Sequence, residues 1–230
     1  MEKSYLSLLE DIKMAYQQHG NLADREYMYV YMRQKFDYYG IKTPLRRSIS
    51  KPFLSAAKIL TKSQMINLVD DLWHLPQREF HHLAMDIAIP RFKKQPEIKD
   101  IHFFEILAET NSWWDTVDFI ANKLMGNYFL VYPEERKYYC DKWIKSGNIW
   151  MVRCAILFQL KYKDKTDINL LFEIIRQTWH TDEFFINKAI GWILRENSKH
   201  IPETIKEFVH NNKSHLSELS RHEALRLITN

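Results

Sequence analysis

The sequence is poor in the residues that form tight turns: its 230 residues include only five glycines and seven prolines. It also has few alternating runs of β-branched residues, and both shortages argue against a sheet protein. No segment approaches the roughly 18 consecutive apolar residues that a membrane span needs. The two cysteines, Cys140 and Cys154, have no CxxC spacing, which indicates a reducing compartment and no disulfide framework.

Several common functional signatures are missing as well. Neither of the glycine-rich phosphate-binding patterns, GxxxxGK[ST] and GxGxxG, is present. The ten histidines include no pair at the i, i+4 spacing of a helical zinc site, so we expect no metal and no cofactor. The first twenty residues alternate charged and apolar groups and contain no signal-peptide core. We therefore expect a cytoplasmic protein that does not enter a membrane.

What is present favours one helical domain spanning residues 1–230. The chain is 46% hydrophobic, which is enough for a sizeable core, and no Ser/Gly-rich linker divides it. Amphipathic segments follow one another, separated by local breaks such as Thr43-Pro44 and Ser146-Gly147. After a first helix around Leu6–Tyr16, the spacing predicts helices over roughly 23–39, 45–59, 62–73, 76–92, 98–109, 113–126, 133–145, 148–162, 167–178, 183–197, 201–211 and 216–229.

The formal net charge of +4 is unevenly distributed. Between Tyr31 and Lys58 the only acid is Asp37, whereas acids outnumber bases between Glu97 and Asp141. A basic stretch beside an acidic one favours an oriented polyanion as partner, although a solvated helix face remains the alternative from charge alone.

A repeat of 35 residues is the decisive feature of the sequence. When the segment beginning at Asn148 is aligned with the one beginning at Glu183 (183 − 148 = 35), Trp150 matches Phe185 and Arg153 matches Lys188. Further steps of 35 reach Glu223 in one direction and Asp118 in the other. A period of this size with two helices per unit predicts an all-α superhelical solenoid of HEAT-like repeats, about six helix pairs, with a concave binding face.

The repeat places three charged residues at equivalent positions: Asp118, Arg153 and Lys188, which we call the charged ladder. Trp114 precedes Asp118 by four residues and Trp192 follows Lys188 by four, so each indole shares a helix face with its charged neighbour. We expect these five side chains to converge on one patch. We expect the remaining tryptophans to pack in the core or between repeats. They are Trp73, Trp113, Trp143, Trp150 and Trp179.

Four strings of the sequence resemble motifs of the AlkD-type alkylpurine DNA glycosylases, in the order of that family. Two are Trp-Trp-Asp-Thr-Val-Asp at 113–118 and the segment from Asn148 through Arg153 to Lys163. The others are Phe-Phe-Ile-Asn-Lys-Ala-Ile-Gly-Trp-Ile-Leu-Arg-Glu at 184–196, and Tyr31-Met32 followed by Gly-Ile-Lys-Thr-Pro-Leu-Arg-Arg at 40–47.

This resemblance implies a monofunctional DNA repair glycosylase that hydrolyses the N-glycosidic bond of N3-alkyladenine and N7-alkylguanine in duplex DNA. By position, Trp114, Asp118 and Trp192 match the family's catalytic residues. Arg153 matches its central DNA-contacting arginine, and Tyr31 matches the tyrosine near the lesion. The resemblance also implies that a base can be removed through contacts to the DNA backbone, without a base pocket.

The chemistry of the groups supports the same roles. An alkylated purine is cationic and departs as a neutral base, so the protein must stabilise positive charge on the deoxyribose, as a fixed carboxylate such as Asp118 can. Indole faces attract cations. Contacts to phosphates are expected from Arg153 and Lys188, with the track extended by Thr43, Arg46, Arg47, Lys161, Lys163 and Arg195.

Two other kinds of function stay open at this level. A non-catalytic binder of damaged or branched DNA would carry the same ladder, and a protein-binding scaffold is the usual role of HEAT-like solenoids. A lyase step through the amine of Lys188 is a further possibility, though a phosphate contact is the more common role of such a lysine. A solenoid that wraps DNA needs no partner subunit, so we expect a monomer.

Overall fold

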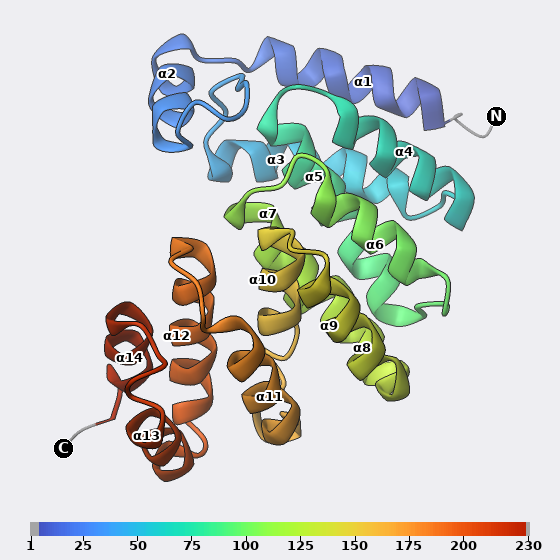
Figure 1. Cartoon of the computed structure of the whole chain (residues 1–230). Coiled ribbons are helices and arrows are strands. Elements are labelled where there is room, and N and C mark those ends of the chain that lie inside the picture. Colours follow the sequence, from blue (N-terminus) through green and yellow to red (C-terminus); the bar gives the residue numbers. More distant parts are fainter. Residues whose placement is uncertain (1–4, 229–230) are drawn as a thin grey trace. The chain divides into compact units, whose positions relative to one another are not determined.

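The computed structural model describes residues 5–228, and most of these residues are helical (Figure 1). Within them the only β-type pairing is an isolated bridge between Asp37 and Gln77. The all-α prediction is confirmed. The chain divides into two compact units, one up to Lys94 and one from Gln95 onward. The expectation that residues 1–230 act as one domain stays a prediction.

The first unit is a cluster of packed helices. Helix α4 packs against α5 and against α1, which also contacts α3. Between α2 and α3 the chain runs as a loop, and the buried carboxylate of Glu79 on α5 holds that loop by accepting hydrogen bonds from the backbone N–H groups of Tyr39, Gly40 and Ile41. The unit consists of α1 (Tyr5–Gln18), α2 (Leu22–Tyr31), α3 (Thr43–Ala57), α4 (Lys62–His74) and α5 (Arg78–Lys94).

The second unit contains the 35-residue repeat. Helix α10 lies at its centre and contacts α6, α7, α9, α11 and α12, while α12 in turn packs against α13 and α14. Its elements are α6 (Asp100–Glu109), α7 (Trp114–Phe119), a π-helix (Ile120–Met125), α8 (Gly126–Val131), α9 (Arg136–Lys145), α10 (Ile149–Leu157), α11 (Ile168–Thr178), α12 (Phe184–Ser198), α13 (Pro202–Asn211) and α14 (Glu218–Leu225).

Most predicted helices agree with the structure to within a few residues, but α8 was not predicted and three expected helices have other bounds. The helix expected over 23–39 is wrong beyond Tyr31, because Arg33 and Gln34 adopt left-handed backbone conformations that end it. The helix expected over 148–162 stops at Leu157. The helix expected over 216–229 is shorter, Glu218–Leu225, and its predicted last residue, Thr229, lies outside the described residues.

The tryptophans expected to pack are all buried, as predicted. Trp113, Trp150 and Phe185 form one aromatic cluster, with ring centroids 5.0–5.4 Å apart. Trp150 and Phe185 are the aromatic pair that the 35-residue alignment matched, so equivalent positions of successive repeats contact each other directly. This cluster joins α7, α10 and α12.

Candidate functional site

Asp118 and Arg153 form a two-point ion pair between α7 and α10. Arg153 Nε donates to Asp118 Oδ1 at 2.7 Å, and a terminal nitrogen of the guanidinium donates to Oδ2 at 2.9 Å. The other terminal nitrogen donates to the backbone carbonyl of Phe185 on α12. Planar two-point pairing fixes the orientation of both groups. Arg153 therefore ties three helices together at the carboxylate.

The two partners differ in how far they face solvent. The side chain of Arg153 is 4% exposed, whereas that of Asp118 is 13% exposed and keeps an accessible edge. Burial raises the pKa of Asp118, and the nearby carboxylate of Asp115 adds to this, while the hydrogen bonds and charge of Arg153 act in the opposite direction. The net effect is a raised pKa of Asp118, because burial outweighs the contacts with Arg153.

A π-helical turn follows Asp118 directly. The sequence predicted a continuous helix over 113–126, but Ile120–Met125 adopts the wider π-helical winding. The side-chain amide of Asn122 donates a hydrogen bond to the backbone carbonyl of Asp118, close to the point where the winding changes. Such turns are rare and often occur at functional sites. Periodicity over so few residues does not distinguish a π-turn from an α-helix, so the pattern of residues could not predict it.

Trp114 and Trp192 lie on the helices that carry the charged ladder. Trp114 is the first residue of α7 and Trp192 lies in the second half of α12, and both are partly exposed. Both helices pack against α10. These two residues thus differ from the other tryptophans, which are buried, because they keep part of their surface exposed to solvent.

Lys188 does not continue the ladder as an unpaired cation. Its Nζ lies 2.8 Å from Oε2 of Glu223 on α14, and Arg195 pairs with the other oxygen of the same carboxylate. The side chain of Lys188 stays 41% exposed and that of Arg195 is 22% exposed. The hydrogen bond from Lys188, with the charges of Arg195 and Lys188, holds the pKa of Glu223 below its ordinary value.

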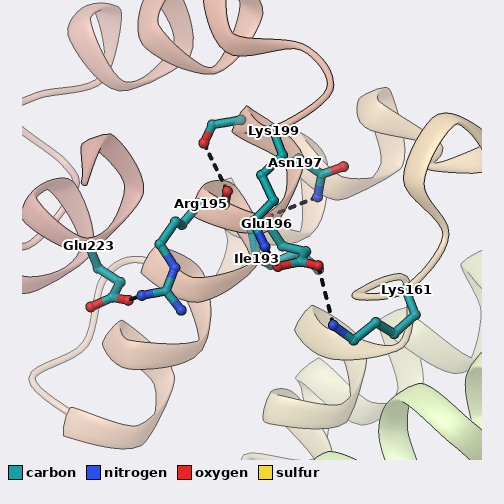
Figure 2. Close-up of polar contacts among 8 residues, drawn as sticks. Lys161, Ile193, Arg195, Glu196, Asn197, Lys199 and Glu223 are labelled. Atoms are coloured by element: carbon teal, nitrogen blue, oxygen red, sulfur yellow. Dashed lines mark hydrogen bonds and ion pairs between the residues drawn. The ribbon is translucent and has the colours of Figure 1, made fainter. Parts of the chain in front are cut away.

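The C-terminal part of α12 is paired on two sides (Figure 2). Arg195 points toward Glu223 on α14, while its neighbour Glu196 points the other way, toward Lys161 after α10. The Lys161–Glu196 contact is 3.2 Å long, and the Lys161 side chain is 51% exposed. Lys163, expected on the same track, is also exposed. Charged groups of neighbouring repeats are thus matched before any ligand binds.

The small size of Gly191 permits the close approach of α12 and α14. A Cβ atom at this position would lie 2.6 Å from Cβ of Glu223 and 3.1 Å from the carbonyl oxygen of Ser220. Any side chain here would push α14 away from α12. Gly191 therefore sets the distance at which Glu223 reaches Lys188 and Arg195.

The first unit carries the remaining predicted residues. Tyr31 at the end of α2 is 62% exposed, and Thr43 and Arg47 at the start of α3 are exposed. Arg46, which was also expected on the phosphate track, is 6% exposed and pairs with Asp86 at 2.8 Å. In this position the guanidinium supports the packing of α3 on α5, and its contact with a phosphate stays a prediction.

Arg153 likewise makes its contacts within the protein, and its role on a phosphate stays a prediction. It was expected to grip a phosphate, yet Nε and both terminal nitrogens of its buried guanidinium are already bound to protein oxygens. Its observed contact is with Asp118. The residues that sequence reasoning gave no role are Glu223 and Glu196, although both lie 35 residues after a predicted base and this spacing could have identified them.

No group of three or more His, Cys, Asp or Glu side chains within residues 5–228 is arranged to hold a metal ion. In the same part of the chain, no helix is long and apolar enough to cross a membrane.

The sequence is similar to DNA repair proteins over nearly its whole length. Residues 12–228 match the sequence model of a family described as DNA alkylation repair enzyme. Among solved structures, one described as a "predicted DNA alkylation repair enzyme" from Enterococcus faecalis is 28% identical and superposes with a TM-score of 0.84. That match covers 92% of this chain and 97% of the other. No curated protein matches the sequence.

Proposed function

Because the chain belongs to the family of DNA alkylation repair enzymes, we propose that it hydrolyses the N-glycosidic bond of cationic alkylated purines in duplex DNA. The substrates are N3-alkyladenine and N7-alkylguanine. The observation that carries this proposal is the two-point ion pair of Asp118 and Arg153, whose carboxylate stays 13% exposed on a helix bundle that also carries the partly exposed residues Trp114 and Trp192.

The reaction does not require strong protonation of the leaving base. The bond between C1′ and the purine nitrogen breaks with its electron pair going to the base, which leaves neutral because alkylation had made it cationic. Positive charge then develops on the deoxyribose, and water adds to C1′ with loss of a proton. Asp118 stabilises that charge electrostatically and orients the water, as carboxylates do at other oxocarbenium-like centres. These steps need neither a metal nor a cofactor.

Arg153 acts on the reaction through Asp118. By donating to both carboxylate oxygens it fixes their orientation, and its charge opposes the effect of burial on the pKa. In the proposed mechanism Arg153 is therefore a positioning residue. A pre-oriented group needs no reorganisation as charge develops, which is the main advantage of such electrostatic stabilisation.

Trp114 and Trp192 supply the walls of the site in this proposal. An indole face attracts a cation by about 0.5–2 kcal/mol, more when water is excluded. The cationic sugar forms only in the transition state, so this attraction lowers the barrier more than it tightens substrate binding. The two rings also offer flat apolar surfaces to the deoxyribose of the damaged strand.

The exposed cations provide the phosphate contacts. In the second unit these are Lys188, Lys161, Lys163 and Arg195, of which all but Lys163 are held in place by a carboxylate partner. In the first unit Tyr31, Thr43 and Arg47 are the exposed candidates. Contacts of this kind position a duplex without reading its sequence, so binding is sequence-tolerant and sensitive to salt. The protein acts as a monomer in this scheme.

The rival function is a binder of damaged DNA without catalysis. The two are separated by incubating the protein with duplex DNA methylated at N7 of guanine and at N3 of adenine, and measuring free bases by chromatography. Release above the spontaneous rate supports the glycosylase. Salt-sensitive binding to the same DNA without release of either base favours the binder.

A further inference from the structure

A basic groove lies between the last two helices, away from the charged ladder. It has a volume of about 560 Å³. The lining residues recur at helical spacing, so that one face of α13 and its C-terminal end meets one face of α14. They are Lys206, Val209, His210 and Lys213 from the first, and Glu218, Arg221, His222, Leu225 and Arg226 from the second.

The charge of this groove is strongly one-sided. Four of its side chains are lysine or arginine and two are histidine, against the single acid Glu218. Among residues 5–228, none of Lys206, Lys213 and Arg226 forms an ion pair. Elsewhere in the same unit, bases such as Lys161 are matched by a carboxylate. Concentrating like charges in one place costs stability unless a negative partner balances them.

Two contacts of α14 tie the groove to neighbouring residues. Arg221 donates to the backbone carbonyl of Lys213 at 2.7 Å, which bridges the two walls. Arg226 lies close enough to Glu223 for its charge to help lower the pKa of that carboxylate. Glu223 is the partner of Lys188 and Arg195. One helix, α14, thus carries both residues of the groove and the carboxylate that pairs with the cations already proposed to hold the DNA backbone.

We propose that the α13–α14 groove binds backbone phosphates of the duplex beyond the lesion, extending the contact surface past Lys188 and Arg195. This inference rests on the proposed function, since it assumes that DNA lies against α12. Lysine and arginine side chains with unmatched charge are the groups that bind phosphates in proteins. A strand held at Lys188 and Arg195 needs only to continue across α14 to reach the groove.

The residues that line the groove favour DNA over a helical peptide or a lipid surface as its partner. Val209, which is buried at the base, and Leu225 are the only apolar residues of the groove. A helical peptide needs a row of apolar anchors in its groove, and a surface that enters a lipid bilayer needs a broad apolar face. Polyanion binding needs neither of these, because released counterions provide the driving force.

The test is the salt dependence of binding to undamaged duplex DNA. We compare the wild type with Lys206→Ala/Lys213→Ala, and with the charge-matched control Lys99→Ala/Lys145→Ala, whose lysines are exposed and lie outside the groove. Each lost phosphate contact reduces the slope of log K against log salt by about 0.9. The slope of the groove variant is expected to be smaller in magnitude than the wild-type slope by roughly 1–2. The control variant is expected to keep the wild-type slope. Melting temperatures of both variants verify that they fold.

The outcomes separate this inference from the proposed function. Equal slopes for all three proteins overturn the proposal that the groove binds phosphates, whether or not alkylated bases are released. A reduced slope for the groove variant alone supports the groove even if the wild type releases no base, which would overturn only the glycosylase. Lysine-dependent binding to phosphatidylglycerol vesicles with an unchanged slope on DNA would assign the groove to a membrane and overturn the inference.

Discussion

Arg153 and Asp118 are 35 residues apart in the chain, yet the guanidinium donates to both oxygens of the carboxylate. The arginine is almost fully buried, and the aspartate keeps an exposed edge. One repeat thus supplies the ionised group and the next repeat holds it. The proposed chemistry depends on this contact, because a carboxylate stabilises a cation only while it is ionised and correctly oriented.

Replacing the arginine should change the pH dependence of the reaction as well as its rate. In Arg153→Met the opposing charge is gone and burial remains, so the pKa of Asp118 rises further. Asp118 is then protonated up to a higher pH, and activity on the acidic side is lost at a higher pH than in the wild type. Single-turnover base release measured across pH tests this.

Arg153→Lys serves as the conservative comparison. It keeps a positive charge but cannot make the two-point contact, so the acidic limb should move less than in Arg153→Met while the maximal rate still falls. An acidic limb that stays at the same pH in both variants would contradict the positioning role of Arg153.

Glu223 should stabilise the fold at neutral pH but not in acid. Its pKa is lowered in the folded state, so it contributes stability above its ordinary pKa and loses that contribution as the pH falls through the folded value. Glu223→Gln is expected to lower the free energy of unfolding by about 2 kcal/mol at neutral pH, as for hydrogen bonds between charged groups. Urea unfolding at neutral and at acidic pH measures the free energy of unfolding of both proteins under the two conditions. A deficit of equal size at both pH values would argue against the ionic origin.

Gly191→Ala should destabilise the protein although alanine is the better helix former. The helix-propensity gain is about 1 kcal/mol. The added Cβ, however, would lie 2.6 Å from the first side-chain carbon of Glu223, which cannot rotate away. Overpacking of this kind costs about 1–3 kcal/mol, so the clash outweighs the gain. A melting temperature at or above that of the wild type would show that α14 adjusts freely.

The tryptophans should divide into two groups when they are truncated. Trp150 is buried between Trp113 and Phe185, so Trp150→Ala is expected to cost about 3–5 kcal/mol of stability. Trp192 is partly exposed. Trp192→Ala should cost less stability, yet slow base release in proportion to a lost cation–π contact. Thermal melts and single-turnover rates on the same preparations separate the effects. Equal destabilisation by both changes would place Trp192 in the core.

The repeat made much of this architecture predictable from the sequence. The period of 35 recurs in the structure as three ion pairs with that separation, Asp118–Arg153, Lys188–Glu223 and Lys161–Glu196. It also recurs in the contact of Trp150 with Phe185. The family predicted from the motifs is confirmed over residues 12–228. Periodicity succeeds here because equivalent positions of stacked repeats are neighbours in space.

What the sequence could not provide was the choice of partner. Arg153 and Lys188 were expected to contact phosphates, but in the structure each of them pairs with a carboxylate 35 residues away. The burial of Arg46 depends on Asp86, which lies 40 residues away and outside the period. The end of α2 at Tyr31 likewise depends on backbone conformations at Arg33 and Gln34, where neither glycine nor proline gives a signal.

The most direct test of the account is single-turnover release of 7-methylguanine from methylated duplex DNA by the wild type and by Asp118→Asn. Asparagine preserves the size of the side chain and removes its charge. Removing a well-placed electrostatic group typically costs about 10²–10³ in rate, and we expect a loss of that order with duplex binding retained. Release by Asp118→Asn at the wild-type rate would contradict the account, because the transition-state charge would then be stabilised elsewhere.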